Sequence, residues 1–191
     1  MSKLQNQLQI LCIVFSMKAL AKIFGLSLLL SIVFLGSVHA ESEKLDGLFL
    51  QLKNAENESE AIAVEGAIWN EWMKSKNPEI DALMRQALRK RNEYDLNGAI
   101  EIFSKVIELA PDFSEGWNQR AIVYFNQEEY EKSLVDIAKT LELEPRHFGA
   151  LGGRAVIRLR QFKHALARQS VIEAMKHHPF LKERHFFPDL Q

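Results

Sequence analysis

Cysteine is nearly absent from this sequence: Cys12 is the only one among 191 residues. A chain with one thiol cannot form an internal disulfide, and everything after residue 12 lacks both a thiolate metal ligand and a cysteine nucleophile. A cysteine-free segment also cannot be mispaired in an oxidising compartment. Disulfide scaffolds, thiolate metal sites and cysteine-dependent enzymes are therefore excluded for residues 13–191.

The sequence also lacks the short motifs of common catalytic and nucleotide-binding sites: G-x-S-x-G, the P-loop, G-x-G-x-x-G and H-E-x-x-H. Gly152 and Gly153 fall inside an expected helix, where they favour close packing rather than phosphate binding. His177 and His178 are adjacent and point about 100° apart on a helix, so we expect no metal site with His185. We expect no cofactor and no enzymatic activity. A hydrolase or transferase with a dispersed site is a remote alternative.

An excess of either sign of charge is lacking as well: the sequence has 24 basic and 25 acidic residues, for a formal net charge of −1. Nucleic acid is a disfavoured partner, because phosphate binding depends on clustered cations. The arginines from 154 to 168 are either a solvated flank that pairs with nearby acids or a patch for an acidic partner; they are Arg154, Arg158, Arg160 and Arg168. His147 and His164 are expected at the surface.

The first forty residues have the layout of a secretory signal peptide. Lys18 and Lys22 precede an uncharged apolar run over residues 23–38, and small residues flank a cleavage site after Ala40. Met17 is a possible true start. We expect cleavage and export, most simply to a bacterial periplasm. The alternative is an uncleaved leader that anchors the protein in the inner membrane, which would be its only contact with a membrane.

A repeat of 34 residues runs through units 80–113, 114–147 and 148–181. Six positions agree in chemical type when the units are aligned: Pro111, Pro145 and Pro179; Phe103, Ile137 and Val171; Ala99, Ser133 and Ala167; Val106, Thr140 and Ala174; Leu83, Trp117 and Leu151; and Ala87, Ala121 and Ala155. Their spacing places them on one face of each of two helices per unit, called A and B. The small columns predict close helix contact. The prolines end helix B, and Asp112 and Ser114 offer a turn and an N-cap for the next helix.

This pattern resembles the tetratricopeptide repeat family. The second unit carries the family's columns at Trp117, Ala121, Tyr124, Ser133, Ile137 and Pro145. Arg120 departs from the usual leucine, which leaves the local packing open. The resemblance implies an all-α fold, a right-handed superhelical α-solenoid of antiparallel helix pairs. It further implies a protein-binding concave surface lined by helix A.

Two flanking segments lie outside the repeats. We expect residues 41–79 to form an N-terminal helical hairpin. This hairpin is either a degenerate repeat that caps the row of units or an unrelated hairpin packed on it. Glu65 stands there in place of a small residue, and Asn77-Pro78 is expected to end its second helix. The apolar tail, residues 182–191, either packs over the last helix or lies in a groove of its own or a neighbouring molecule.

The face of helix A that points away from helix B is the candidate groove. Asn118 and Arg91 are expected to fix a ligand's polar groups, and Phe125 and Leu88 to anchor its apolar ones, as suits a peptide or a helix. The full set is Met84, Leu88, Arg91, Asn92, Asn118, Ile122, Phe125, Asn126, Val156, Leu159 and Arg160. Alternatively, Ile122 and Leu88 only pack against the next unit. The Lys/Asn set of the family's carboxylate-gripping members is not found.

We therefore expect a non-enzymatic interaction module of the cell envelope that binds a protein or peptide. The alternative is a structural or assembly scaffold that acts by self-association or is held at the inner membrane. The sequence leaves the partner and the oligomeric state open.

Overall fold

Helices make up nearly all of the part of the chain that the computed structural model describes, residues 43–190. The first spans residues 43–53. The others are α2 (Glu58–Trp72), α3 (Pro78–Asn92), α4 (Leu96–Leu109), α5 (Ser114–Asn126), α6 (Tyr130–Leu143), α7 (Phe148–Arg160) and α8 (His164–Met175), followed by the 3-10 helices η1 (Lys182–Phe186) and η2 (Pro188–Leu190). Residues 47–190 form one compact unit, and no strand occurs between residues 43 and 190. The predicted leader, residues 1–40, lies outside the described residues.

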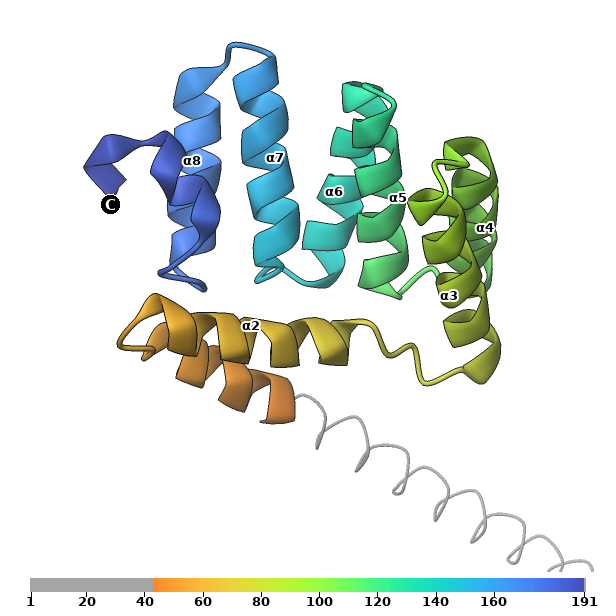
Figure 1. Cartoon of the computed structure of the whole chain (residues 1–191), viewed down its shortest axis with the longest axis horizontal. Coiled ribbons are helices and arrows are strands. Elements are labelled where there is room, and N and C mark those ends of the chain that lie inside the picture. The colour runs from red at the N-terminus through yellow and green to blue at the C-terminus, as the bar shows by residue number, and fades with distance from the viewer. Residues whose placement is uncertain (1–42, 191) are drawn as a thin grey trace, which may run out of the picture. The chain divides into compact units, whose positions relative to one another are not determined.

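The three predicted units fold as three helical hairpins, α3/α4, α5/α6 and α7/α8, which stand side by side (Figure 1). The fold is an all-α solenoid of antiparallel helix pairs, as predicted. None of the helices between residues 43 and 190 is both long and apolar enough to cross a lipid bilayer.

The repeated columns form the interior of the hairpins. The small column of helix B is buried at all three positions, Ala99, Ser133 and Ala167. The hydroxyl of Ser133 donates a hydrogen bond of 2.8 Å to the backbone oxygen of Ala121, which belongs to the small column of helix A. The two small columns therefore meet, and a larger side chain at either one would separate the helix backbones.

The turns between helices A and B also repeat every 34 residues. Tyr94, Glu128 and Phe162 have φ angles of 60°, 61° and 58°, which places each in the left-handed region. Such a residue closes a short turn after a helix, although a side chain there has a steric cost. The structure thus repeats a backbone conformation that the side chains at these positions do not reveal.

Two predicted helix ends differ from the structure. Asn77 and Pro78 begin α3 rather than end α2: the Asn77 side chain accepts from the backbone N–H of Glu79, and Pro78 is the first helical residue. Proline suits that position because the N–H it lacks would have no helical partner. The N-cap of α5 is Phe113, without a side-chain hydrogen bond, so neither Asp112 nor Ser114 caps it.

Arg120, which stands where the repeat pattern expects leucine, links three helices. Its guanidinium donates to both carboxylate oxygens of Asp136, at 2.8 and 2.9 Å, and to the hydroxyl of Ser104 at 3.0 Å. Arg154, one repeat later, donates to Ser170 and Glu173, which both lie on α8. The arginine column therefore ties helix A to helix B by charge where an aliphatic side chain would do so by packing.

The α2 helix does not extend the row of hairpins. It runs across the ends of the repeat helices, where α5 and α7 begin (Figure 1). Its Trp69 and Trp72 pack on His147 and Phe148 at the start of α7. This differs from the expected capping repeat, because the two indoles find their aromatic partners where the second unit meets the third.

The apolar tail packs on its own chain. Phe187 is buried and packs with Leu190 against a cluster of α7 and α8 residues that includes Ala155 and Val171. Phe186 remains exposed. The tail is therefore a short segment that covers the last hairpin, the first of the two alternatives.

Candidate functional site

A small apolar cavity lies between α5, α6 and α7, here called the apolar slot. Its volume is about 120 Å³. Ile122 and Phe125 line it from α5, Ile137 from α6 and Val156 from α7, with Asn118 at one end. Gly149 and Gly153 of α7 also line it, and a Cβ on Gly153 would lie 3.6 Å from Cδ1 of Ile137, in ordinary contact.

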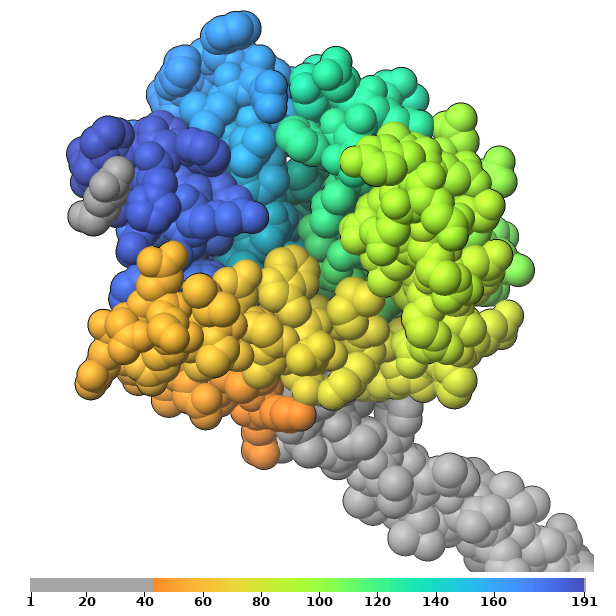
Figure 2. All heavy atoms as spheres, in the orientation of Figure 1, coloured from red at the N-terminus to blue at the C-terminus, as the bar shows by residue number. Residues whose placement is uncertain are grey.

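A larger cavity of about 450 Å³ adjoins the slot and shares Asn118, Ile122 and Gly149 with it. We call it the acidic chamber. Its walls come from α2, the starts of α5 and α7, and the segment after α8; they include Glu58, Ile62, Glu65, Trp69, Phe148, His178, Phe180, Leu181, Lys182 and Glu183. In Figure 2 the surface is hollowed above α2, between α5 and the C-terminal segment. The slot and the chamber together form the candidate site.

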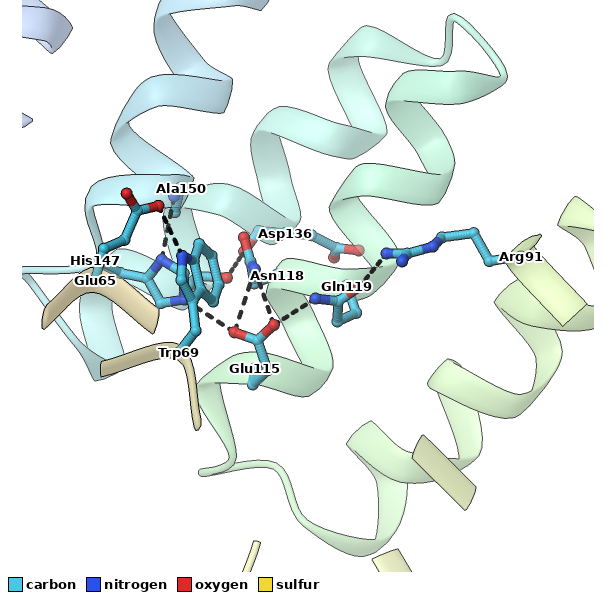
Figure 3. Close-up of polar contacts among 10 residues, drawn as sticks. Glu65, Trp69, Arg91, Glu115, Asn118, Gln119, Asp136, His147 and Ala150 are labelled. Atoms are coloured by element: carbon cyan, nitrogen blue, oxygen red, sulfur yellow. Dashed lines mark hydrogen bonds and ion pairs between the residues drawn. The ribbon is translucent and has the colours of Figure 1, made fainter. Parts of the chain in front are cut away.

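A chain of buried polar side chains supports this region from behind (Figure 3). Glu115, at the start of α5, is fully buried and accepts from the side-chain amides of Asn118 and Gln119. The oxygen of Gln119 in turn accepts from Arg91 of α3. Because each member has a partner, the buried carboxylate is satisfied and α5 is fixed against α3.

His147 continues this chain towards α7. Its Nδ1 accepts the backbone N–H of Ala150 at 3.1 Å, so Nδ1 carries no proton, and Nε2 donates to Glu115 over 3.0 Å. His147 therefore caps α7 and ties it to α5 at the same time. Its ring is fully buried, so the expectation of a surface histidine was wrong, whereas His164 is exposed as expected. The repeat pattern gave no sign of this role, since histidine is an unusual N-cap.

The α2 helix is held over the chamber by both aromatic and polar contacts. The indole N–H of Trp69 donates to Glu65 at 3.1 Å, and the other Glu65 oxygen lies 3.1 Å from Nε2 of His178. The hydrogen bond from His178 lowers the pKa of the Glu65 carboxyl. A Cβ atom on Gly149 would lie 2.5 Å from the Trp69 ring, so only glycine allows this approach.

The far wall of the chamber holds two polar atoms without a hydrogen-bond partner. They are Oε2 of Glu183, a residue 8% exposed, and Nδ1 of His178, a residue 2% exposed. Burial raises the pKa of the Glu183 carboxyl. Gly152 makes room for this carboxyl, since a Cβ there would lie 3.0 Å from the Glu183 carboxyl carbon. The glycine pair of α7 therefore serves close packing, in part against the tail.

The structure separates the eleven predicted groove residues into three groups. Four of them line the apolar slot: Asn118, Ile122, Phe125 and Val156. Three line a different hollow beside Tyr94: Arg91, Asn92 and Asn126. The other four do not share a cavity with either group: Met84 is buried in the first hairpin, Leu88 and Leu159 pack against core clusters, and Arg160 is exposed.

Sequence reasoning missed the contribution of α2 and of the segment after α8. Glu65 within an otherwise apolar stripe was the available signal, because an acid at a buried-face position needs a polar partner. That partner, His178, is 113 positions away, and no local spacing connects the two.

Two arginines from the basic stretch 154–168 form ion pairs within the chain. Arg154 pairs with Glu173 and Arg168 with Asp189, so these arginines pair with nearby acids. Between residues 43 and 190, no group of three or more histidine, cysteine or acidic side chains is arranged to hold a metal ion.

The chain is similar to a TPR repeat-containing protein of Rhizobium etli, with 39% identity over 115 residues, which is 60% of this chain. The match spans 56% of the length of that relative. No protein-family model matches the chain. The row of helical hairpins agrees with this similarity to a TPR repeat-containing protein.

Proposed function

We propose that this protein is a non-enzymatic interaction module that holds an extended segment or a helix of a partner protein over the apolar slot. The observation that carries the proposal is the slot itself: Ile122, Phe125 and Val156 converge on an open cavity that the chain's own core does not fill. An apolar anchor entering it gains about 25 cal/mol for each Å² of apolar surface removed from water.

The buried network makes the slot a preformed site. The Glu115 carboxylate holds Asn118, and His147 fixes the start of α7, so both walls are ordered before a partner arrives. A partner then loses less free energy to ordering of the receptor.

We further propose that the protein works in the cell envelope, after export by the leader. The lysines, the apolar run and the small residues before position 41 support this. Mass spectrometry of the protein purified from its own host tests it. A mature N-terminus at Glu41 is expected, and an intact leader would instead favour the membrane-anchored alternative.

The binding proposal is tested with two matched valine variants. Val156 lines the slot, whereas Val135, on α6, is 67% exposed on the outer surface. We expect Val156→Asp to lose the partner in affinity capture from envelope extract, quantified by mass spectrometry, and Val135→Asp to keep it. Thermal unfolding shows whether each variant is folded. Equal capture by the wild type and a folded Val156→Asp variant would contradict the proposal.

Self-association is the second candidate function. Tyr94 and Phe162, at equivalent turns of the first and third units, are 86% and 85% exposed, and such aromatic side chains favour contact with another surface. Light scattering over a range of concentrations separates the two. A monomer at all concentrations excludes a scaffold that acts by self-association, whereas a stable oligomer that Phe162→Ser disrupts would support it.

A further inference from the structure

The acidic chamber has a charge that the slot lacks. Its ionisable side chains are Glu58, Glu65, Glu183, His178 and Lys182. The only fixed positive group is Lys182, whose side chain is 87% exposed and whose Nζ lies 4.0 Å from Glu183. Three carboxylates therefore face one cation that is largely in water, which disfavours an anionic occupant and favours a cationic one.

Glu183 provides the second, independent observation. It is more than nine-tenths buried, it lines the chamber, and its Oε2 accepts no hydrogen bond. Oε2 is itself shielded from the chamber, whereas Oε1 lies 4.0 Å from Nζ of the exposed Lys182. Buried carboxylates normally have several donors, so this one has room at Oε1 for a donor that a ligand could supply. Burial is the main cause of the raised pKa of Glu183, and the nearby charge of Glu65 adds a smaller contribution. A single cation between Glu65 and Glu183 would supply the missing donor to Glu183 and offset the repulsion between the two carboxylates.

The remaining walls suit the stem of a long cationic side chain. Trp69, Phe148 and Phe180 are aromatic, and Ile62 and Leu181 are aliphatic. Lysine and arginine bury their methylene stems along such surfaces, and their charged heads are attracted to aromatic faces. Because Asn118, Ile122 and Gly149 line both cavities, an occupant of the chamber lies next to an occupant of the slot.

We propose that the acidic chamber binds a lysine or arginine side chain of the partner, with its charged head at Glu183, while an adjacent apolar side chain enters the apolar slot. This deepens the proposed function and rests on it. The recognised element is an apolar residue next to a basic one. Glu183 and Glu65 determine the preference for the charge, and Ile122, Phe125 and Val156 the preference for the apolar neighbour.

The test titrates the purified protein with four probes: acetyl-Gly-Leu-Arg-Gly-amide, its lysine and glutamine counterparts, and agmatine alone. The readout is the indole N–H resonance of Trp69, which reports the chamber directly because that group bonds to Glu65. The arginine and lysine peptides should bind about tenfold more tightly than the glutamine peptide, as expected for a charge-assisted hydrogen bond. Agmatine alone should bind more weakly, because it has no group for the slot.

Two variants that should change the affinity for the arginine peptide in opposite directions test whether the chamber is the binding site. Glu183→Gln should lose about tenfold in affinity for the arginine peptide, and Lys182→Glu should gain affinity, since it removes the competing cation. Lys182 is exposed, so that variant stays folded even if Glu183→Gln does not. Glu142→Gln is the matched control, because Glu142 is an exposed residue on α6 and its loss should change nothing.

Equal binding of the three peptides, no binding by any of them, or wild-type affinity in both chamber variants would overturn the proposal. Agmatine binding as tightly as the peptides would replace the partner side chain with a free amine, and so would also overturn it. If these results occur while Val156→Asp still loses the partner, only the inference about the chamber fails.

Discussion

The imidazole of His147 lies flat against the indole of Trp72, with the ring centroids 4.0 Å apart and the planes inclined by 9°. The same imidazole donates to Glu115 of α5 and caps α7. One side chain thus joins α2 to the second and third hairpins. The position of α2 over the candidate site therefore depends on a residue at the end of a repeat, outside the repeated columns.

Replacing His147 by phenylalanine should retain an aromatic ring but remove both hydrogen bonds. We expect the free energy of unfolding, measured by urea denaturation, to fall by about 2 kcal/mol or more, because α7 loses its cap and buried Glu115 loses a donor. His164→Phe is the control, since His164 is exposed, and it should change stability by less than about 0.5 kcal/mol. Equal effects of the two variants would contradict the role given to His147.

Gly149→Ala and Gly66→Ala should change stability in opposite directions. A Cβ on Gly149 meets the Trp69 ring, which must move, so we expect a loss of about 1–3 kcal/mol and a shift in tryptophan fluorescence. Gly66 lies within α2 with nothing within 4 Å of its added Cβ, and alanine there should add about 0.5–1 kcal/mol. Thermal unfolding checks both. A tolerated Gly149→Ala would show that Trp69 does not lie against α7.

The pair Arg120–Asp136 should show strong coupling in a double-mutant cycle. Asp136 is 2% exposed, so Arg120→Leu leaves a buried carboxylate without its main partner and should cost about 3–5 kcal/mol. Arg120→Leu/Asp136→Leu should be much closer to the wild type, because no charge then remains buried. Urea denaturation of the four proteins gives the coupling energy. Additive losses in the double variant would mean that the two side chains act independently.

Glu183→Gln should increase stability at neutral pH. Burial raises the folded-state pKa of Glu183, so the ionised carboxyl destabilises the fold. The stability that protonated Glu183 contributes to the fold is fully present below the pKa of this group in the unfolded chain. It is lost as the pH rises through the higher pKa of the folded state. The stability gained by the glutamine variant should therefore appear as the pH rises above the unfolded pKa of glutamate, about 4.3, and vanish at lower pH. Glu65 and His178 face Glu183, so the same series in Glu142→Gln gives the background; a gain that does not depend on pH would contradict the assignment.

The hairpins could be predicted because their determinants are local and repeated. Ala99, Ser133 and Ala167 recur at one spacing, and each is buried where the spacing requires it. The Arg120 position could not be resolved from the sequence, because its partner Asp136 is on the next helix and reads as an ordinary surface acid. The placement of α2 was also out of reach, since it depends on contacts of Trp69 and Trp72 with residues about 75 positions away.

The candidate site was predictable only in part, for the same reason. Helical periodicity places Asn118, Ile122 and Phe125 on one face of α5, and the structure brings them to one cavity with Val156. The same periodicity selects Met84, which lies in the core, because the first hairpin packs that position inward. The chamber is formed by side chains from both ends of the described chain, and only the folded structure brings Glu65, His178 and Glu183 together.

The central claim is that a partner occupies the slot between α5 and α7. Amide hydrogen exchange, measured by mass spectrometry with and without the captured partner, tests it most directly. We predict slower exchange in Ser114–Asn126 and Phe148–Arg160 when the partner is bound, and unchanged exchange in Leu96–Leu109. Protection confined to α4, α6 and α8, with none in α5 or α7, would contradict it.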